Sequence, residues 1–326
     1  MWVTSSLTTA LTPTAVALGN FDGVHRGHRQ VIYPIANAAA IAPVLPASLQ
    51  KQESKHGYAT VLTFHPHPQE FFTGQPRLLL TPLDEKVEQL DVMGIEQLVL
   101  LPFDRDLASL SPQQFVEEIL VRHLQASQVS VGMDFRFGQQ RAGTATDLQA
   151  IAATYGIAVN IASLETCKGE RISSSAIRQA LQQGDLACAN RLLGRSYTVM
   201  GQVVQGQQLG RTIGFPTANL KLSPDKFLPR QGVYCVRVSS SVLGNRESPL
   251  SGVMNLGYRP TVDGTYQTVE IHLLDWSGDL YGHTLTVSLE QFLRPEQKFA
   301  SLDALKTQIQ ADCAAARAIL TSAPTP

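Results

Sequence analysis

The feature that most constrains the fold is a change of pattern near residue 190. Before it, short apolar runs alternate with amphipathic segments, and after about residue 195 nearly every regular stretch is strand-like. Alternating strands and helices favour βαβ units and a mostly parallel sheet, whereas short strands divided by glycine, proline and asparagine favour a compact antiparallel barrel. The sequence therefore predicts a Rossmann-like α/β domain, residues 1–190, and a small β-barrel domain with a C-terminal helix, residues 191–320.

Individual elements follow from the same patterns. We expect strands at 14–18, 58–64, 97–101, 129–132 and 156–161, and then at 197–204, 232–238, 268–274 and 284–289. Helix starts are indicated near Arg26, at Thr81-Pro82, and at Ser111, where Pro112 and Gln114 complete a capping box. A closing helix from about Ser301 should cover the barrel with Leu302, Leu305, Ile309 and Cys313. Residues 42–57 are expected to form an exposed loop, and 321–326 a frayed end.

Composition limits the class of ligand and the compartment. The 326 residues include 26 basic and 27 acidic side chains and are 44% hydrophobic, which is an ordinary globular balance with a net charge of −1. A sequence-independent nucleic-acid binder needs a basic field, so no nucleic-acid partner is expected. No apolar run approaches the roughly 20 residues of a membrane span, and the four cysteines lack CxxC spacing. We expect a cytoplasmic protein with no membrane partner and a small ligand; the oligomeric state stays open.

The string GNFDGVHRGH, Gly19 to His28, joins an expected strand to an expected helix. Free N–H groups and the positive end of the helix dipole can hold phosphate at such a junction, and Gly23 and Gly27 allow close approach. His25 and His28 would share one helical face and could donate hydrogen bonds to an α-phosphate during in-line displacement. The same spacing also suits a pair of zinc ligands or two solvated surface residues.

Three further strings in the first domain carry polar groups at a strand end or a helix start. TFHPHP presents His65 and His67, which could touch phosphate or shape the loop. GMDFRFG presents Asp134 with two aromatic rings that could grip adenine or ribose, although lone aromatic residues are more often core. RISSSAIR, residues 171–178, opens a helix with hydroxyl and guanidinium donors suited to the β- and γ-phosphates, or with an ordinary serine cap.

In the second domain, GRTIGFPTANL, residues 210–220, combines flexible glycines and a proline-fixed turn with Thr217 and Asn219, whose oxygens suit Mg²⁺. VEIHLLD, residues 269–275, places Glu270 and His272 on one face of a strand. A carboxylate at the mouth of a barrel could deprotonate a primary alcohol for attack on a γ-phosphate. Taken alone, Glu270 would be an ordinary exposed strand residue.

Together these strings resemble a known family. GNFDGVHRGH is similar to the HxGH signature of the nucleotidyltransferase superfamily, in the form carried by the bifunctional riboflavin kinase/FAD synthetase family of bacteria. GFPTAN, NLGYRPT and DLYGHTLTVSLEQFLRPEQKF resemble the riboflavin kinase module of that family. The resemblance runs from about Thr14 to Asp312. The chain departs from it at Val262, where the family usually carries phenylalanine, and in the longer 42–57 loop.

The resemblance implies two reactions and a set of site residues. The barrel domain would phosphorylate riboflavin with MgATP to FMN, and the nucleotidyltransferase domain would transfer AMP from a second ATP to give FAD and pyrophosphate, with no zinc. The implied catalytic residues are His25, His28 and the base Glu270, with Thr217 and Asn219 as metal ligands. The implied ATP or phosphate contacts are Gly19, Phe21, Asp22, Gly23, His65, Asp134, Arg171, Ser174, Ser175, Arg178, Gly210, Arg211, Gly214 and Pro216. The implied flavin contacts are Asn255, Arg259, Pro260, Thr261 and Arg294.

Two hypotheses from other classes compete with this one. Four imidazoles near one sheet edge, those of His25, His28, His65 and His67, could form a zinc-dependent hydrolase site. Alternatively, the chain could be a flavin-binding regulator without turnover. Neither hypothesis requires GFPTAN and Glu270 in one barrel, and we rank both below the transferase.

Overall fold

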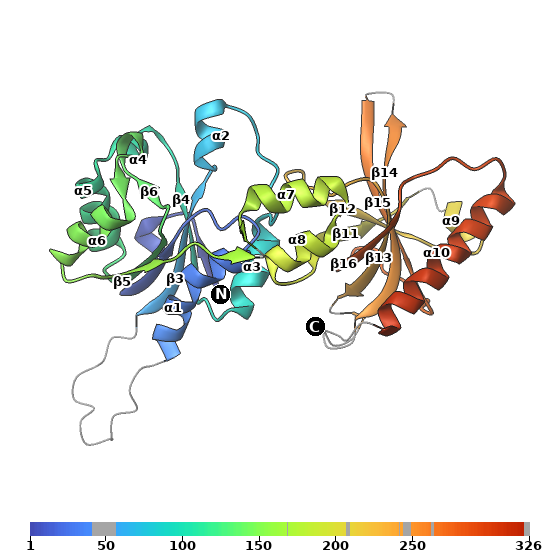
Figure 1. Cartoon of the computed structure of the whole chain (residues 1–326), viewed down its shortest axis with the longest axis horizontal. Helices are drawn as coiled ribbons and strands as arrows, with labels where there is room; N and C mark the ends of the chain where they lie inside the picture. The colour runs from blue at the N-terminus through green and yellow to red at the C-terminus, as the bar shows by residue number, and fades with distance from the viewer. Residues whose placement is uncertain are drawn as a thin grey trace, which may run out of the picture. The chain divides into compact units, whose positions relative to one another are not determined.

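The computed structural model describes residues 1–40, 57–167, 169–206, 209–240, 242–243, 249–261 and 264–322. The chain divides into two compact units, Met1–Ser173 and Ser174–Pro326, which are coloured from blue to green and from yellow-green to red in Figure 1. Three regions with predictions lie outside the described residues: positions 42–56 of the expected exposed loop, Val262, and positions 323–326 of the expected frayed end.

The first unit is built on a six-stranded sheet whose strand order is β1-β4-β3-β2-β5-β8. Every neighbouring pair in it is parallel, as the alternation of strand and helix patterns predicts. The strands are β1 (Trp2–Thr4), β2 (Thr14–Leu18), β3 (Tyr58–His65), β4 (Gln97–Pro102), β5 (Ala126–Gly132) and β8 (Ala158–Ala162). All five expected strands are confirmed, and the short edge strand β1 is an addition.

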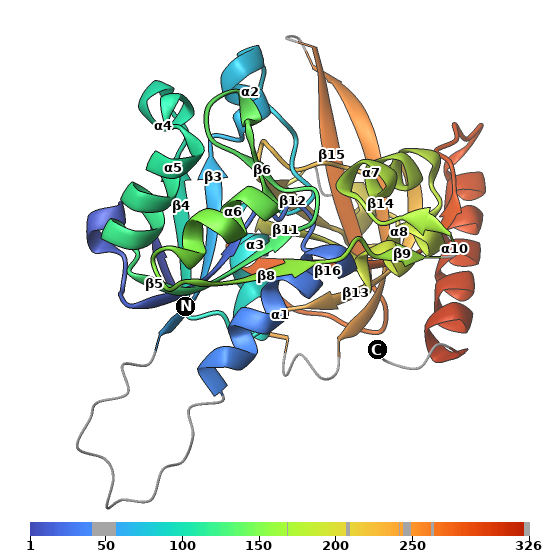
Figure 2. The ribbon, with the colours of Figure 1, turned by 60° about the vertical axis from the view of Figure 1, so that its left-hand side comes forward.

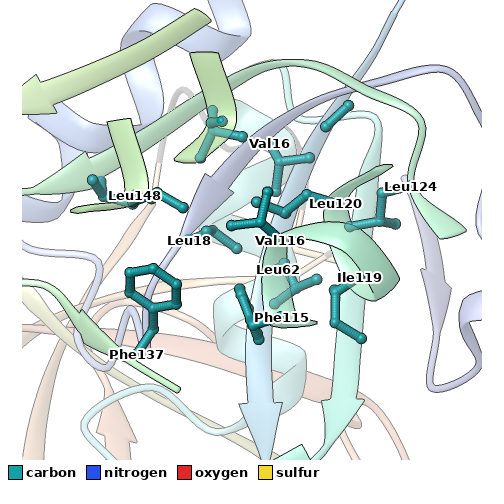
Figure 3. Packing of buried hydrophobic residues seen from close by; sticks show 14 of the residues in the cluster. Val16, Leu18, Leu62, Phe115, Val116, Ile119, Leu120, Leu124, Phe137 and Leu148 are labelled. Atoms are coloured by element: carbon teal, nitrogen blue, oxygen red, sulfur yellow. The ribbon is translucent and has the colours of Figure 1, made fainter. Parts of the chain in front are cut away.

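Helices cover both faces of this sheet, because successive residues of its strands point to opposite sides. In β2, Val16 and Leu18 pack with residues of α5, η3 and α6, whereas Ala15 and Ala17 pack with residues of α1 and α3. Figure 3 shows the first of these cores, in which Phe115 and Leu120 lie against Leu62 and Leu18. This doubly wound arrangement leaves the carboxyl ends of the strands as the natural place for ligands.

Three helices of the first unit, α1, α3 and α5, begin close to the expected positions, and the others are additions. The helices of this unit are η1 (Leu7–Thr9), α1 (Arg26–Ala40), α2 (Pro68–Thr73), α3 (Leu83–Val92), α4 (Arg105–Ser109), α5 (Pro112–Phe115), the π-helix η3 (Val116–His123), η4 (Gln139–Arg141) and α6 (Ala145–Ala153). The capping box at Ser111 is confirmed. At α3 the helix start is confirmed, but Thr81 does not cap it, since its hydroxyl accepts the Gly23 N–H instead.

Two small antiparallel pairs complete the first unit. They are β6 (Arg136–Phe137) with β7 (Gly143–Thr144), and β9 (Thr166–Cys167) with β10 (Glu170–Arg171).

The second unit is a closed antiparallel barrel with strand order β11-β12-β15-β14-β13-β16, as the strand-rich pattern predicts. Its strands are β11 (Tyr197–Val204), β12 (Ala218–Leu222), β13 (Gly232–Ser239), β14 (Leu250–Thr261), β15 (Gly264–Leu273) and β16 (Thr284–Arg294), with the short helix α9 (Leu209–Thr212). The pair β14 and β15 is the long orange hairpin of Figure 2. The expected strands are confirmed, and β12 and β14 are additions.

The C-terminal helix α10 (Leu302–Ser322) covers the outer side of β13 and β14, as expected. Cys313, Ala316 and Leu320 pack there against Val233 and Val253. The prediction was wrong for Leu302, which is 64% exposed because the first turn of the helix extends beyond the barrel wall.

Two further helices, α7 (Ser174–Gln183) and α8 (Leu186–Leu193), pack with the barrel. Asn190 ties α8 to it, because its carboxamide donates to the Leu289 carbonyl and accepts the Tyr197 N–H. Packing therefore divides the chain at residue 173/174. The expected division of activities at 190/191 stays a prediction.

Candidate active sites

The first candidate site lies at the carboxyl edge of the parallel sheet. Strand β2 is the neighbour of both β3 and β5, and all three run in the same direction. The loop of Gly19–His25, the HPHP segment that ends β3, and Asp134 after β5 therefore leave the sheet at one edge, as the sequence predicts.

The loop between β2 and α1 has an unusual backbone that neighbouring segments hold in place. Phe21, Gly23 and Val24 have φ values of +48°, +95° and +40°, of which only the glycine value is free of strain. Asp22 Oδ1 accepts N–H groups from Leu80 at 2.7 Å and Thr81 at 3.3 Å. Strained backbone persists only where its surroundings determine it, so the buried Asp22 has a structural role here. Its expected phosphate contact stays a prediction.

His25 and His28 form a stacked pair at the start of α1. Their ring centroids lie 3.5 Å apart with the planes inclined by 14°, and His25 is only 6% exposed. His25 Nδ1 accepts the His28 backbone N–H at 3.2 Å, so the His25 proton is on Nε2 when the ring is neutral. Phe21 and His28 make a T-shaped ring contact with centroids 5.4 Å apart. The expected shared face of the two imidazoles is thus present.

Two glycines of this motif make room for rings. A Cβ on Gly19 would lie 3.0 Å from the Phe21 ring, and a Cβ on Gly27 would lie 3.3 Å from the His25 ring. Gly27 therefore permits the imidazole to fold back over the first turn of α1. This packing is a second reason for a glycine between the histidines, beside the expected close approach of phosphate.

A buried lysine behind the loop escaped the sequence analysis. Lys86 of α3 is 8% exposed, and its ammonium donates to the Asn20 carbonyl at 3.0 Å. Thr63 Oγ1 donates to the same oxygen at 3.1 Å. Lys86 and Leu90 stand four positions apart on one helical face, so a charged residue in an apolar stripe was the signal that could have revealed it.

The HPHP segment separates its two histidines. His67 caps α2, since its Nδ1 accepts the Gln69 N–H at 3.1 Å, whereas His65 is exposed. An aromatic group follows, in which Phe103 makes edge contacts with Phe71 and Phe72 at 5.4 and 5.8 Å between centroids. Phe72 is 71% exposed. These aromatic residues, at the same edge as the histidine pair, were not predicted.

Asp134 and Arg171 form an ion pair with each other, and both side chains are about half exposed. An exposed pair of this kind contributes little stability, so a ligand can replace it at small cost. The adjacent aromatic residues belong to the core: Phe137 is 5% exposed and stacks on Phe135, with centroids 5.8 Å apart. Of the two interpretations of these rings, the structure therefore favours the core.

The serines of RISSSAIR begin α7, as expected, and this helix packs with the second unit. The Arg178 guanidinium lies 4.8 Å from the centroid of the Phe227 ring. The expected binding of outer phosphates by Ser174, Ser175 and Arg178 stays a prediction.

The second candidate site begins with the GFPTAN turn. Phe215 N–H donates to the Gly210 carbonyl at 2.8 Å, and Gly214 has φ +89°. A Cβ on Gly210 would lie 2.2 Å from the Phe215 carbonyl oxygen, so only glycine fits that position. Arg211 is exposed. Thr217 follows this turn and directly precedes Ala218, the first residue of β12.

Three polar residues lie side by side on adjacent strands. Asn219 of β12 and Asn255 of β14 are the register partners of Glu270 on β15. Directly opposed residues share one face of a sheet, with Cβ atoms about 5 Å apart. Thr217 Oγ1 donates to Glu270 Oε2 at 3.4 Å, which completes a cluster of hydroxyl, carboxamide and carboxylate groups. We call Thr217, Asn219, Asn255 and Glu270 the barrel-wall cluster.

The barrel-wall cluster faces outward. Val269 and Ile271, on either side of Glu270, are 3% and 0% exposed, while Val253, two residues from Asn255, packs under α10. The structure therefore places Glu270 on the outer wall of the barrel, and not at its mouth as we expected from the sequence. Glu296 joins the cluster at its edge, because its Oε1 accepts from Asn255 Nδ2 at 3.4 Å.

The expected flavin residues lie in three places, of which Asn255 in the barrel-wall cluster is the first. Arg294 makes a two-pronged ion pair with Asp312 of α10, with a shortest distance of 2.7 Å, so its guanidinium fastens that helix to the barrel. Arg259, Pro260 and Thr261 end β14, where the structure describes the backbone only. For all of these, flavin contact stays a prediction.

Comparison with known proteins assigns each unit to a class of transferase. The FAD synthetase family model matches residues 7–176, and the riboflavin kinase family model matches residues 193–320. The bifunctional riboflavin kinase/FMN adenylyltransferase of Escherichia coli K12 is 44% identical over 306 residues, 93% of this chain and 91% of that protein. The protein of the same description from Bacillus subtilis 168 is 36% identical over 304 residues, 92% of this chain and 90% of that one.

The chain therefore belongs to the bifunctional riboflavin kinase/FMN adenylyltransferase family. It is an enzyme of flavin cofactor biosynthesis, which uses ATP to convert riboflavin to FMN and FMN to FAD. The resemblance found in the sequence motifs is confirmed.

One solved structure is similar over nearly its full length. The crystal structure of a macrolide-efflux protein from Streptococcus pneumoniae has a TM-score of 0.79 and 31% sequence identity, and the match covers 97% of this chain and 98% of that one. Within the described part of the present chain, no helix has both the length and the apolar character needed to cross a bilayer.

Proposed function

We propose that the two activities use separate sites, with adenylyl transfer at the carboxyl edge of the parallel sheet and phosphoryl transfer at the barrel-wall cluster. The observation that carries the proposal is the register of β12, β15 and β14, which aligns Asn219, Glu270 and Asn255 beside Thr217. A carboxylate flanked by neutral oxygen and amide groups has the chemistry that a kinase acting on a primary alcohol requires.

In the kinase reaction, Glu270 is the base. It accepts the proton of the riboflavin 5′-hydroxyl while that oxygen attacks the γ-phosphorus of ATP, and ADP leaves. The hydrogen bond from Thr217 restrains the carboxylate before substrate binds. Gly210 and Gly214 have no side chain, so we expect the phosphates to approach the main chain of the turn at these two positions.

The residues of the barrel-wall cluster fit Mg²⁺. Thr217 and Asn219 offer hard oxygen ligands, and a magnesium site normally completes its octahedron with water and phosphate oxygens, so few protein ligands are needed. The described residues contain no group of three or more histidine, cysteine or acidic side chains that could hold a metal ion. When bound, Mg²⁺ would neutralise charge on the phosphates of ATP.

In the adenylyl transfer, His25 and His28 stabilise the α-phosphate while the FMN phosphate attacks it and pyrophosphate leaves. His25 Nδ1 accepts the His28 N–H, so the proton of the neutral ring is on Nε2, and Nε2 is the atom from which we expect His25 to donate to a phosphate oxygen. The His25–His28 stack and the contact of the His25 ring with Gly27 fix the direction of the rings. Asp134 and Arg171 separate from each other to bind the adenylate and the outer phosphates.

The aromatic group of Phe71, Phe72 and Phe103 supports a place for the flavin at the same edge. Phe72 is exposed and packs with the half-buried rings of Phe71 and Phe103 beside the end of β3, and a flat heterocycle stacks favourably on such rings. We assign it to the isoalloxazine of FMN.

Free thiols support a cytoplasmic location. All four cysteines are unpaired, and burial raises the pKa of the Cys235 thiol to about 11, which keeps it protonated and unreactive. Unpaired cysteines are typical of a reducing compartment.

The proposal is tested by incubating the purified chain with riboflavin and ATP at graded Mg²⁺ concentrations and resolving the flavins by chromatography over time. We expect FMN to form first and FAD to follow, both requiring Mg²⁺, with no stoichiometric zinc in the protein. Binding of riboflavin without product would favour a regulator, and one zinc ion per chain would favour a hydrolase. Either outcome would overturn the proposal.

A further inference from the structure

His272 lies two residues after Glu270 on β15, on the same side of the strand. Its Nδ1 is 2.8 Å from the Pro216 carbonyl oxygen. A carbonyl oxygen only accepts hydrogen bonds, so Nδ1 carries the proton and donates. The His272 and Phe215 rings also meet in a T-shaped contact, with centroids 5.5 Å apart. Both contacts are to the turn that carries Thr217.

The position of this contact along the strand pair explains its importance. The ladder between β12 and β15 begins with Ala218 opposite Ile271, and Asn219 opposite Glu270 is next. By the same register, Thr217 would stand opposite His272, but the ladder stops one residue short of that pair. At the position where the main-chain hydrogen bonds between β12 and β15 end, the His272 side chain therefore supplies a hydrogen bond in their place. This bond holds the peptide group between Pro216 and Thr217.

We propose that His272 is a positioning residue for phosphoryl transfer: its Nδ1–H fixes the Pro216–Thr217 peptide and thereby the distance between Thr217 and Glu270. This inference rests on the proposed function of the barrel-wall cluster. His272 itself touches neither the reacting hydroxyl nor the phosphates. It acts through Thr217, whose hydroxyl donates to Glu270 at 3.4 Å in this structure.

Substitutions of His272 separate the hydrogen bond from the packing. His272→Phe keeps a ring against Phe215 and removes the hydrogen-bond donor. In His272→Asn the amide nitrogen is bonded to Cγ, as Nδ1 is in histidine, so it can donate to the Pro216 carbonyl in its place. A misplacement of about 1 Å in a reacting group can lower turnover by about a hundredfold, so we expect His272→Phe to lower riboflavin kinase kcat by about 10- to 100-fold. The KM for riboflavin should change by less than about threefold, and His272→Asn should recover most of the kcat.

Adenylylation of supplied FMN by the same protein is the internal control for folding. It should be unchanged in both variants, and His283→Phe, which replaces an exposed histidine elsewhere on the barrel, should leave the kinase unchanged. A fully active His272→Phe, a His272→Asn as impaired as His272→Phe, or a parallel loss of adenylylation would each overturn the inference. Glu270→Gln is measured beside them, since a fully active Glu270→Gln kinase would instead refute the proposed function.

Discussion

The ion pair between Arg294 and Asp312 makes a quantitative prediction about what holds α10 on the barrel. The Asp312 carboxylate accepts hydrogen bonds from Arg294 Nε at 3.0 and 3.1 Å, from Arg294 Nη2 at 2.7 Å and from Gln308 at 2.9 Å. The two charged side chains are only 18% and 7% exposed. Water therefore cannot easily replace either partner.

Asp312→Ala leaves the Arg294 guanidinium without its anion. Removing one partner of a buried pair costs about 3–5 kcal/mol, and we expect the lower end because Arg294 keeps a hydrogen bond to the Pro295 carbonyl and some exposure. For a unit of about 150 residues, about 3 kcal/mol corresponds to a fall of about 6–12 °C in the melting temperature of the second unit. Asp312→Asn, which keeps one acceptor oxygen, should lose less.

The assay is residual activity after brief heating, measured for both reactions in the same sample. Asp312→Ala should lose riboflavin kinase activity at a lower temperature than the wild type, while adenylylation of FMN survives to the usual temperature. Asp303→Ala, at an exposed position in the first turn of α10, is the matched control and should behave as wild type. If Asp312→Ala inactivates within about 2 °C of the wild type, the pair does not fasten the helix.

Three further predictions concern other parts of the chain. Asp22→Ala removes the acceptor of the Leu80 and Thr81 N–H groups, so adenylylation should fall at least about tenfold with the kinase unchanged, and equal loss of both reactions would argue against a local role. Phe72→Ser should raise the KM for FMN in adenylylation without altering the melting temperature, whereas an unchanged KM would remove this ring from the flavin surface. Burial raises the pKa of Glu290, so ionisation of this carboxyl opposes folding. Glu290→Gln should therefore raise the melting temperature at pH 8, and the increase should disappear below about pH 4.5, where the carboxyl is protonated in both the folded and the unfolded chain. A difference in melting temperature that does not change with pH would refute this.

Much of the fold could be predicted because the pattern of each unit is consistent with its architecture. Strands such as Thr14–Leu18 are buried on both faces of a parallel sheet and show a continuous apolar run. The barrel strand β14 escaped because its outward residues include Asn255, and glycines interrupt its apolar sequence. Leu302 was misplaced because periodicity gives the face of a helix but not how far the helix extends beyond its partner.

The motifs with candidate catalytic residues could be recognised in the sequence, but the residues that hold these motifs in place could not. The structure brings His25 and His28 together through local geometry, since His25 directly precedes α1 and His28 lies in its first turn, three positions on. Asp22 and Lys86, in contrast, make contacts across 58 and 66 residues of sequence, which no local pattern reveals. For the same reason, the link from His272 to Pro216, across 56 residues, was visible only in the structure.

The division of labour between the two units is tested most directly by two reciprocal variants in one chromatographic assay. With riboflavin and MgATP, His28→Ala should accumulate FMN and form no FAD. Glu270→Ala should form no FMN from riboflavin, yet it should convert supplied FMN to FAD at close to the wild-type rate. If either variant loses both reactions equally, or if His28→Ala still produces FAD at the wild-type rate, the assignment of one reaction to each unit is wrong.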